Sequence, residues 1–122
     1  MSSILHTHES GGTHTTDVVI VGAGPVGLFA VFELGLLNLR CHLVDILGQC
    51  AELCPEKPIY DIPAVPICTG QELTDALLKQ ISPFNAEYHF NQMVESLTRD
   101  GDAWIVKTDG DTTIRAKVIV IA

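Results

Sequence analysis

The stretch DVVIVGAGPVGLFAVFELGLLNLRCHLVD, residues 17–45, decides the fold. It contains a short apolar run rich in β-branched residues, a glycine turn, an apolar stretch of helical length and a second apolar run. This order predicts a β-α-β unit. The apolar residues in each run are continuous rather than alternating, which is typical of parallel strands covered on both faces.

Three glycines in the turn, Gly22, Gly24 and Gly27, have the spacing G-x-G-x-x-G between the predicted strand and the predicted helix. Gly22 permits a tight turn, Gly24 lets the backbone approach a pyrophosphate, and Gly27 lets the helix pack close to the strand. The helix N-terminus, where Pro25 and Val26 lie, presents free N–H groups and a positive dipole end to that pyrophosphate. We therefore favour dinucleotide binding by these five residues over a purely structural glycine turn.

An acid follows at the end of the second predicted strand. Asp45 can accept hydrogen bonds from both hydroxyls of an adenosine ribose, and it would repel a 2′-phosphate. The cleft therefore disfavours NADP. The fingerprint by itself does not separate FAD from NAD.

Composition limits the class of protein. The chain has 122 residues, 47% of them hydrophobic, with a mean hydropathy of +0.30, which predicts one folded domain. A net charge of −8 disfavours nucleic acid and anionic membranes and favours small-molecule ligands. Because there is neither an apolar run of membrane-spanning length nor a signal pattern, we expect a cytoplasmic protein.

Residues 1–16 are mostly Ser, Thr, Gly and His, so we expect a disordered tail, with order beginning at Asp17. The histidines of this tail, His6, His8 and His14, could bind a transition metal, but a solvated polar arm is the favoured interpretation. No metal site is expected.

Four cysteines are too few for a disulfide scaffold, and none form a C-x-x-C pair. Cys50 and Cys54 could share a helix face for zinc, but no second pair has a suitable spacing. We predict buried or half-buried free thiols at all four positions, Cys41, Cys50, Cys54 and Cys68.

The second half of the chain predicts one helix and a set of short strands. Thr69 and Glu72 have capping-box spacing, and Pro83 ends the helix. Its expected apolar face consists of Leu73, Ala76, Leu77 and Ile81. Asp-Gly pairs at 100–101 and 109–110 predict type I′ hairpins between the strands, and KVIVIA closes the chain as a separate apolar strand.

This order, in which a Pro-bearing loop, one helix and a meander follow the β-α-β unit, resembles the FAD domain of the glutathione-reductase and thioredoxin-reductase superfamily. The stretch GQCAELCPEKPIYDIP, residues 48–63, is more specific. Its Gly-Gln, Pro-Glu-Lys and Ile-Tyr-Asp segments resemble the thioredoxin-reductase-like ferredoxin–NADP reductases. The similarity runs from about residue 17 to residue 122.

The resemblance implies an α/β fold, with a Rossmann-like parallel sheet and an antiparallel meander. It also implies FAD on residues 17–122, NADPH on a second lobe, homodimerisation and electron exchange with ferredoxin. No second G-x-G-x-x-G is present. We therefore expect the N-terminal part of an FAD domain, inactive alone, without the NADPH lobe and the C-terminal segment.

The same resemblance assigns roles to single residues. Gln49 would bond the flavin or its ribityl region, Asp45 the adenosine ribose, and the backbone of Val94 the adenine edge. Cys54 stands where family members usually have an aromatic that stacks on the isoalloxazine. Apart from the resemblance, Gln49 reads as a solvent-facing loop amide and Val94 as an ordinary strand residue. No catalytic side chain is nominated, because the cofactor carries the chemistry.

Two other functions remain open. GAGPVGL also occurs at the start of FAD-dependent aromatic hydroxylases, which would need a long substrate domain and a later Gly-Asp motif. A non-catalytic dinucleotide-binding or dimerisation module is the second alternative. Flavin absorbance separates a flavoprotein from an empty or NAD-binding module.

Overall fold

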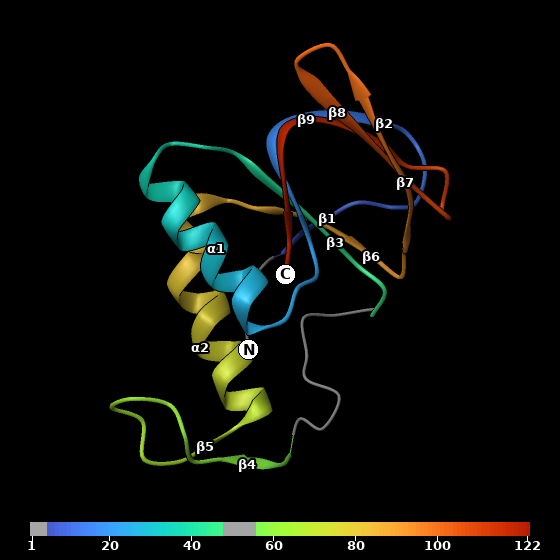
Figure 1. Ribbon diagram of the computed structural model, residues 1–122. Coiled ribbons are helices and arrows are strands. Elements are labelled where there is room, and N and C mark those ends of the chain that lie inside the picture. The colour runs from blue at the N-terminus through green and yellow to red at the C-terminus, as the bar shows by residue number, and fades with distance from the viewer. Residues whose placement is uncertain (1–4, 48–55) are drawn as a thin grey trace.

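A seven-stranded sheet organises residues 5–47 and 56–122, the part of the chain that this computed structural model describes (Figure 1). The strand order is β1-β6-β3-β2-β9-β8-β7. The strands of this sheet are β1 (His6–Thr7), β2 (Thr13–Val21), β3 (Cys41–Asp45), β6 (Glu87–Phe90), β7 (Val94–Asp100), β8 (Ala103–Thr108) and β9 (Thr113–Ile121). The remaining elements are helices α1 (Pro25–Leu36) and α2 (Gly70–Ile81), the 3₁₀ helix η1 (Ser82–Phe84), and a short hairpin of β4 (Pro58–Ile59) and β5 (Cys68–Thr69).

The predicted β-α-β unit is confirmed. Strand β2 pairs in parallel with β3 on one side and with β9 on the other. Its side chains are buried on both faces: Val18 and Ile20 belong to the core shared with α1 and α2, and Val19 packs with Val44 in a second cluster. The meander β7-β8-β9 is antiparallel. The α/β class inferred from the sequence is therefore confirmed.

Helix α2 begins with the predicted capping box. The Glu72 amide donates to the Thr69 hydroxyl (3.1 Å), and the Thr69 amide donates to the Glu72 carboxylate (2.8 Å). The predicted apolar face is wrong in part, because Ala76 is exposed. The buried positions have the spacing i, i+3, i+4 and i+7 of a different helical face, formed by Thr74, Leu77, Leu78 and Ile81.

The hairpin turns differ from the expected type. Between β7 and β8 the two loop residues are Gly101 and Asp102, and only Gly101 has a positive φ, 62°. In the next turn the residue with positive φ is Asp111, at 61°. A type I′ turn requires positive φ at both central positions, so the predicted turns are wrong. Strand β9 is also continuous from Thr113, rather than two separate strands.

The N-terminal segment differs from the expected tail. Residues 6–7 form β1 on the edge of β6, and β2 begins at Thr13 rather than at Asp17. The reason is the length of β9, which pairs with β2 from Thr113 and gives residues 13–16 a hydrogen-bonding partner. The limit at residue 17 remains a prediction as a domain boundary.

Two cysteines lie in the described part of the chain, and both are free. Cys41 is buried and Cys68 is half-buried, as predicted. Burial, followed by the charge of Asp17, raises the pKa of the Cys41 thiol to about 11, so it is protonated and unreactive at neutral pH. Cys50 and Cys54 lie outside the described residues.

Candidate functional site

The glycine turn and the acid meet at the carboxyl edge of the parallel strands. Val21 and Val44 are register partners, so Gly22, which follows β2, lies beside Asp45, the last residue of β3. The Gly22 amide donates to the Val44 carbonyl (2.8 Å), which fixes the turn to β3. This edge is where open α/β sheets bind their ligands.

The three glycines occupy three different environments. Gly22 has a φ of 110°, and a Cβ there would lie 2.7 Å from the Ala122 carbonyl oxygen. A Cβ on Gly27 would lie 2.0 Å from the Gly22 carbonyl oxygen, so only glycine allows α1 to approach the turn this closely. Gly24 has an ordinary φ of −77°, and a Cβ there would meet no protein atom within 4 Å.

Helix α1 begins without a side-chain cap. Gly24 is the N-cap residue and makes no side-chain hydrogen bond, and Pro25 in the first turn has no N–H to satisfy. The first turn of a helix leaves its amides without intrahelical partners, and in α1 these include the amides of Val26 and Gly27. The first turn carries no acidic residue. It is therefore suited to an anion.

Asp45 is half-buried and linked to the turn through the backbone. Burial raises the pKa of its carboxyl group, while hydrogen bonds from the amides of Ala23, Leu47 and Ile46 act in the opposite direction. Ala23 is the central residue of Gly22-Ala23-Gly24, so the carboxylate is oriented by the turn itself. The structure thus brings the predicted ribose ligand and the predicted pyrophosphate turn together.

The structure does not test the predicted roles of the three remaining site residues, Val94, Gln49 and Cys54. Val94 begins β7 and packs against the cluster that contains Val19 and Val44, so it lies under the strands that lead to the site. Whether its backbone meets an adenine stays a prediction. Gln49 and Cys54 lie outside the described residues, and their roles also stay predictions.

Sequence reasoning missed Gln92, which is almost fully buried next to the end of β3. The backbone amide of Gln92 donates to the backbone carbonyl of Asp45 (3.1 Å). The side-chain oxygen of Gln92 accepts hydrogen bonds from the Thr108 and Thr112 hydroxyls (2.7 and 2.6 Å). It therefore ties the end of β3 to the β8–β9 turn. The sequence predicts one strand segment over residues 88–99, and a lone Gln within it carries no pattern that would reveal this role.

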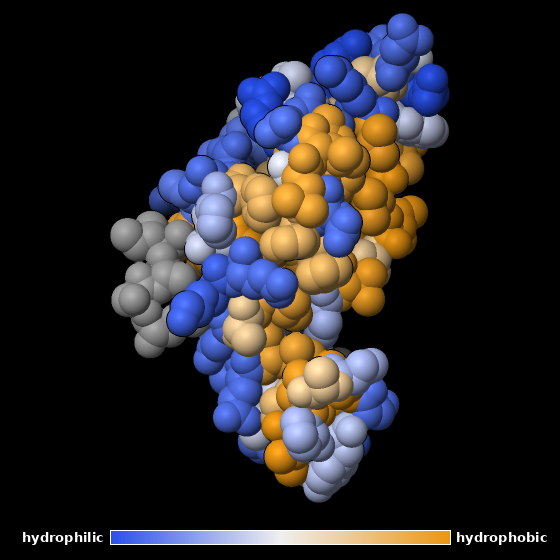
Figure 2. Space-filling model, turned by 90° about the vertical axis from the view of Figure 1, so that its left-hand side faces the viewer, coloured by the Kyte–Doolittle hydropathy of each residue, from blue (hydrophilic) through white to orange (hydrophobic). Residues whose placement is uncertain are grey.

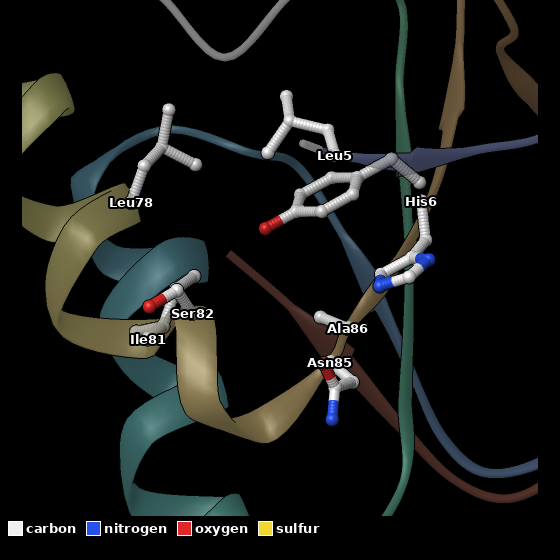
Figure 3. Close-up of a pocket in the computed structure, with 8 residues that line it drawn as sticks. Leu5, His6, Leu78, Ile81, Ser82, Asn85 and Ala86 are labelled. Carbon is white, nitrogen blue, oxygen red and sulfur yellow. The ribbon is translucent and has the colours of Figure 1, made fainter. Parts of the chain in front are cut away.

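A small cavity lies far from this edge, between β1 and the end of α2 (Figure 3). Leu5, His6, Leu78 and Asn85 are among the residues that line its volume of about 50 Å³. That volume holds a few water molecules and not a dinucleotide. It also lies at the amino end of β6, away from the glycine turn.

Hydrophobic side chains are exposed on the surface, and Figure 2 shows a continuous patch of them on one face. Among the described residues, exposed large hydrophobic side chains include Val26, Phe29 and Leu36 on α1 and Val118 and Ile121 on β9. Patches of this kind are typical of surfaces that contact another protein segment.

Curated relatives give the sequence comparison. No protein-family model matches the chain. Proteins named ferredoxin–NADP reductase from Parvibaculum lavamentivorans and Nitrobacter winogradskyi are 64% and 61% identical over 115 and 112 residues. These matches cover 90% and 88% of this chain, and 34% and 33% of the relatives. The chain thus spans about a third of the length of the relatives.

Solved structures give the fold comparison. A thioredoxin reductase from Streptococcus pyogenes matches with a TM-score of 0.78 at 25% identity, covering 88% of this chain and 34% of its own. A cyclohexanone monooxygenase matches with a TM-score of 0.70 at 24% identity, covering 89% and 27%, which shows the fold alone. The resemblance inferred from the sequence is confirmed: along a third of their length, this chain is similar to ferredoxin–NADP reductases and shares the fold of thioredoxin reductases.

Proposed function

We propose that this chain binds the ADP half of FAD within a flavoprotein that transfers electrons between NADPH and a ferredoxin. The observation that carries the proposal is the environment of Gly24. Its backbone conformation is open to any residue, and no atom of residues 5–47 or 56–122 occupies the place of a side chain. Neither backbone strain nor internal packing therefore explains a glycine at this position, whereas a pyrophosphate lying against the backbone does.

The residues around Gly24 fit the group that the resemblance implies. The uncapped amides of Val26 and Gly27 suit the pyrophosphate, and the carboxylate of Asp45 suits the ribose hydroxyls. When bound, FAD supplies hydride acceptance from NADPH and delivery of single electrons to a ferredoxin. The described residues bind and orient the adenine end, and none is required as an acid or base.

Sequence identity favours a reductase over a monooxygenase. The identity to relatives named ferredoxin–NADP reductase is 58–64%, whereas the monooxygenase shares 24% and only the fold. We also infer a homodimer, which the resemblance implies and the exposed apolar side chains support, and a cytoplasmic location, as expected from the sequence pattern. No helix in residues 5–47 or 56–122 is long and apolar enough to cross a membrane.

Replacing Gly24 tests the binding proposal. The chain and its Gly24→Ala and Gly24→Val variants are titrated separately with FAD and with ADP. We expect the Kd of both ligands to rise with side-chain size, by at least about a hundredfold in Gly24→Val, which corresponds to about 2.7 kcal/mol. Circular dichroism should be unchanged, because the space beside Gly24 is open.

The matched control is Gly101→Asn, in the exposed β7–β8 turn, where asparagine tolerates the positive φ. Its affinities should equal those of the parent chain. Unchanged FAD and ADP binding in Gly24→Val would contradict the assignment. Electron transfer is tested separately, as NADPH-dependent reduction of a ferredoxin by the whole polypeptide that the gene encodes.

A further inference from the structure

Four of the five histidines in the chain gather in one cluster. His8 follows β1, His14 lies in β2, His42 in β3 and His89 in β6. The ring centroids of His8, His14 and His89 are 4.6 to 4.9 Å apart, and His42 lies 5.1 Å from His89. Glu87 completes this histidine cluster and is its one carboxylate.

Hydrogen bonds connect the cluster in a chain. His8 Nε2–H donates to Glu87 Oε1 (2.7 Å), and His42 Nε2–H donates to Glu87 Oε2 (3.0 Å). A neutral His42 therefore accepts at Nδ1, where His89 Nε2–H donates (2.8 Å). His89 Nδ1 is then a buried acceptor, and it has no hydrogen-bond partner. His14 Nε2 is also buried without a hydrogen-bond partner, so among the described residues the cluster contains two buried imidazole nitrogens that no hydrogen bond satisfies.

The nitrogens of His8 and His42 that face Glu87, and the nitrogens that join His42 to His89, are paired with one another. In residues 5–47 and 56–122, no group of three or more His, Cys, Asp or Glu side chains is arranged to hold a metal ion. The cluster in this geometry therefore binds protons. It can hold few of them, because a single carboxylate compensates one imidazolium, and a second would place like charges about 5 Å apart.

Burial also limits the number of protons that the closed cluster can bind. His42 is 3% exposed and His89 is 0% exposed. Burial lowers the pKa of His42, against the opposing charge of Glu87, and it lowers the pKa of His89 to about 3, with further lowering by the other three histidines. The titratable groups that act on both rings are His8, His14 and Glu87. His89 is therefore neutral near pH 7 while the cluster is closed, and burial disfavours the charged form of His42.

The segment of residues 5–12 closes the cluster and is weakly attached. It contains the two-residue strand β1 at the sheet edge, and it carries His8. The His8 amide donates to the Tyr88 carbonyl (2.8 Å), the Gly11 amide to the Thr112 hydroxyl (2.9 Å), and the Thr113 amide to the Gly12 carbonyl (2.9 Å). The pairing of β1 with β6, the packing of Leu5 on the core and the His8–Glu87 bond also hold the segment. Because β1 is only two residues long and lies at the sheet edge, we expect its opening to require less free energy than global unfolding.

We propose that residues 5–12 form a pH-dependent latch, which is docked on β6 at neutral pH and released when the histidine cluster takes up protons. Release removes His8 from the stack and gives water access to His42 and His89, which can then be charged. The open state binds more protons than the closed state. Acidification therefore favours opening.

Amide hydrogen exchange of the 122-residue chain tests the latch. Protection of the His8 and Thr113 amides is measured at pH 7.5, 6.5 and 5.5 in EDTA and corrected for intrinsic exchange. We expect protection to fall about tenfold per pH unit for each proton taken up on opening. The Val18 amide, which donates to the Arg40 carbonyl inside the sheet, should stay much more protected than the His8 amide.

Two variants sharpen the test. Glu87→Gln keeps the side-chain shape but removes the compensating charge, so release should occur about one pH unit higher. His6→Gln alters the fifth histidine, which is exposed on β1 and outside the cluster, and should leave the pH profile unchanged. Three results would overturn the proposal: pH-independent protection of His8, loss of protection at Val18 in parallel with His8, or a pH response that disappears when EDTA is added.

Discussion

At the carboxyl ends of β2 and β3 the chain leaves backbone donors unpaired, whereas toward their amino ends it pairs polar side chains with one another. The amides of Val26 and Gly27 have no side-chain cap from Gly24, and no atom in the described part of the chain lies beside Gly24. In the histidine cluster, Glu87 and three imidazoles form consecutive hydrogen bonds. The two regions lie on the same parallel strands.

In the first region the polar groups are available to an external ligand, whereas in the second they bond mainly to one another. Unpaired donors in an exposed turn cost little, because water satisfies them until an anion arrives. Buried imidazoles have no such water, so they must find partners within the protein. Variants of the glycine turn and Asp45 should therefore affect ligand binding, and variants of the histidine cluster should affect the response to pH.

The largest expected effect is on stability, at Gly27. A Gly27→Val side chain would collide with the Gly22 carbonyl, a backbone atom that cannot move aside, and we expect a loss of about 3 kcal/mol in the free energy of unfolding. Urea denaturation measures it. Gly24→Val is the matched control and should cost less than about 1 kcal/mol, because no protein atom is near. Equal losses in both variants would show that the two glycines do not differ as described.

The next effect is on affinity, at Asp45. Asp45→Ala removes charge-assisted hydrogen bonds worth about 1.5 to 3 kcal/mol, so FAD should bind about one to two decades more weakly in isothermal titration. Asp45→Asn keeps one oxygen acceptor for the turn amides, so its affinity for FAD should lie between those of the parent and of Asp45→Ala. Asp102→Ala, an exposed acid in the β7–β8 turn, is the control. An Asp45→Ala affinity within twofold of the parent would favour a surface acid without a ribose contact.

A smaller effect concerns pH. His89 has a folded pKa of about 3, below its ordinary value of about 6.5, so the folded state binds fewer protons than the unfolded state. Its contribution to stability is complete above about pH 6.5 and is lost as the pH falls toward 3. Between pH 6.5 and 5.5 we expect a loss of about 1 kcal/mol in the free energy of unfolding, measured by urea denaturation. A flat profile above pH 5.5 would show that His89 is protonated in the folded state.

The smallest effect lies outside both regions. Thr69→Ala removes the side chain that caps α2, and we expect a loss of about 1 kcal/mol. Neither FAD affinity nor the exchange of the His8 amide should change. A change in either would mean that α2 is coupled to the two regions more tightly than their separation implies.

The features that could be predicted from the sequence are those encoded in neighbouring residues. The glycine spacing and the two apolar runs predicted the β-α-β unit, and Thr69 with Glu72 predicted the start of α2. The Asp-Gly pairs located the hairpins but not their type, since a loop shifted by one residue places the positive φ elsewhere. Local chemistry therefore indicates where a turn occurs better than it indicates the turn geometry.

The features that could not be predicted depend on pairing between distant segments. Residues 13–16 look like a solvated arm until β9 is known to run beside them. His8 and His89 lie 81 positions apart, and no periodicity connects them. Gln92 is similar, because its partners Thr108 and Thr112 come from another turn. Such clusters follow from topology, which single-sequence patterns do not specify.

The pairing of β2 with β9 has a consequence for folding in the cell. Ile20 pairs with Val120, a separation of 100 residues, so the central strand of the sheet acquires its second neighbour only near the end of this sequence. At a synthesis rate of about 5 to 20 residues per second, β2 leaves the ribosome about 5 to 20 s before β9. During that interval one edge of a strongly apolar strand is unpaired and open to wrong partners. The turn at Gly22 lies against Ala122, so it acquires this neighbour only after β9 has been synthesised. If the turn binds a nucleotide as proposed, nascent chains should do so only after β9 emerges.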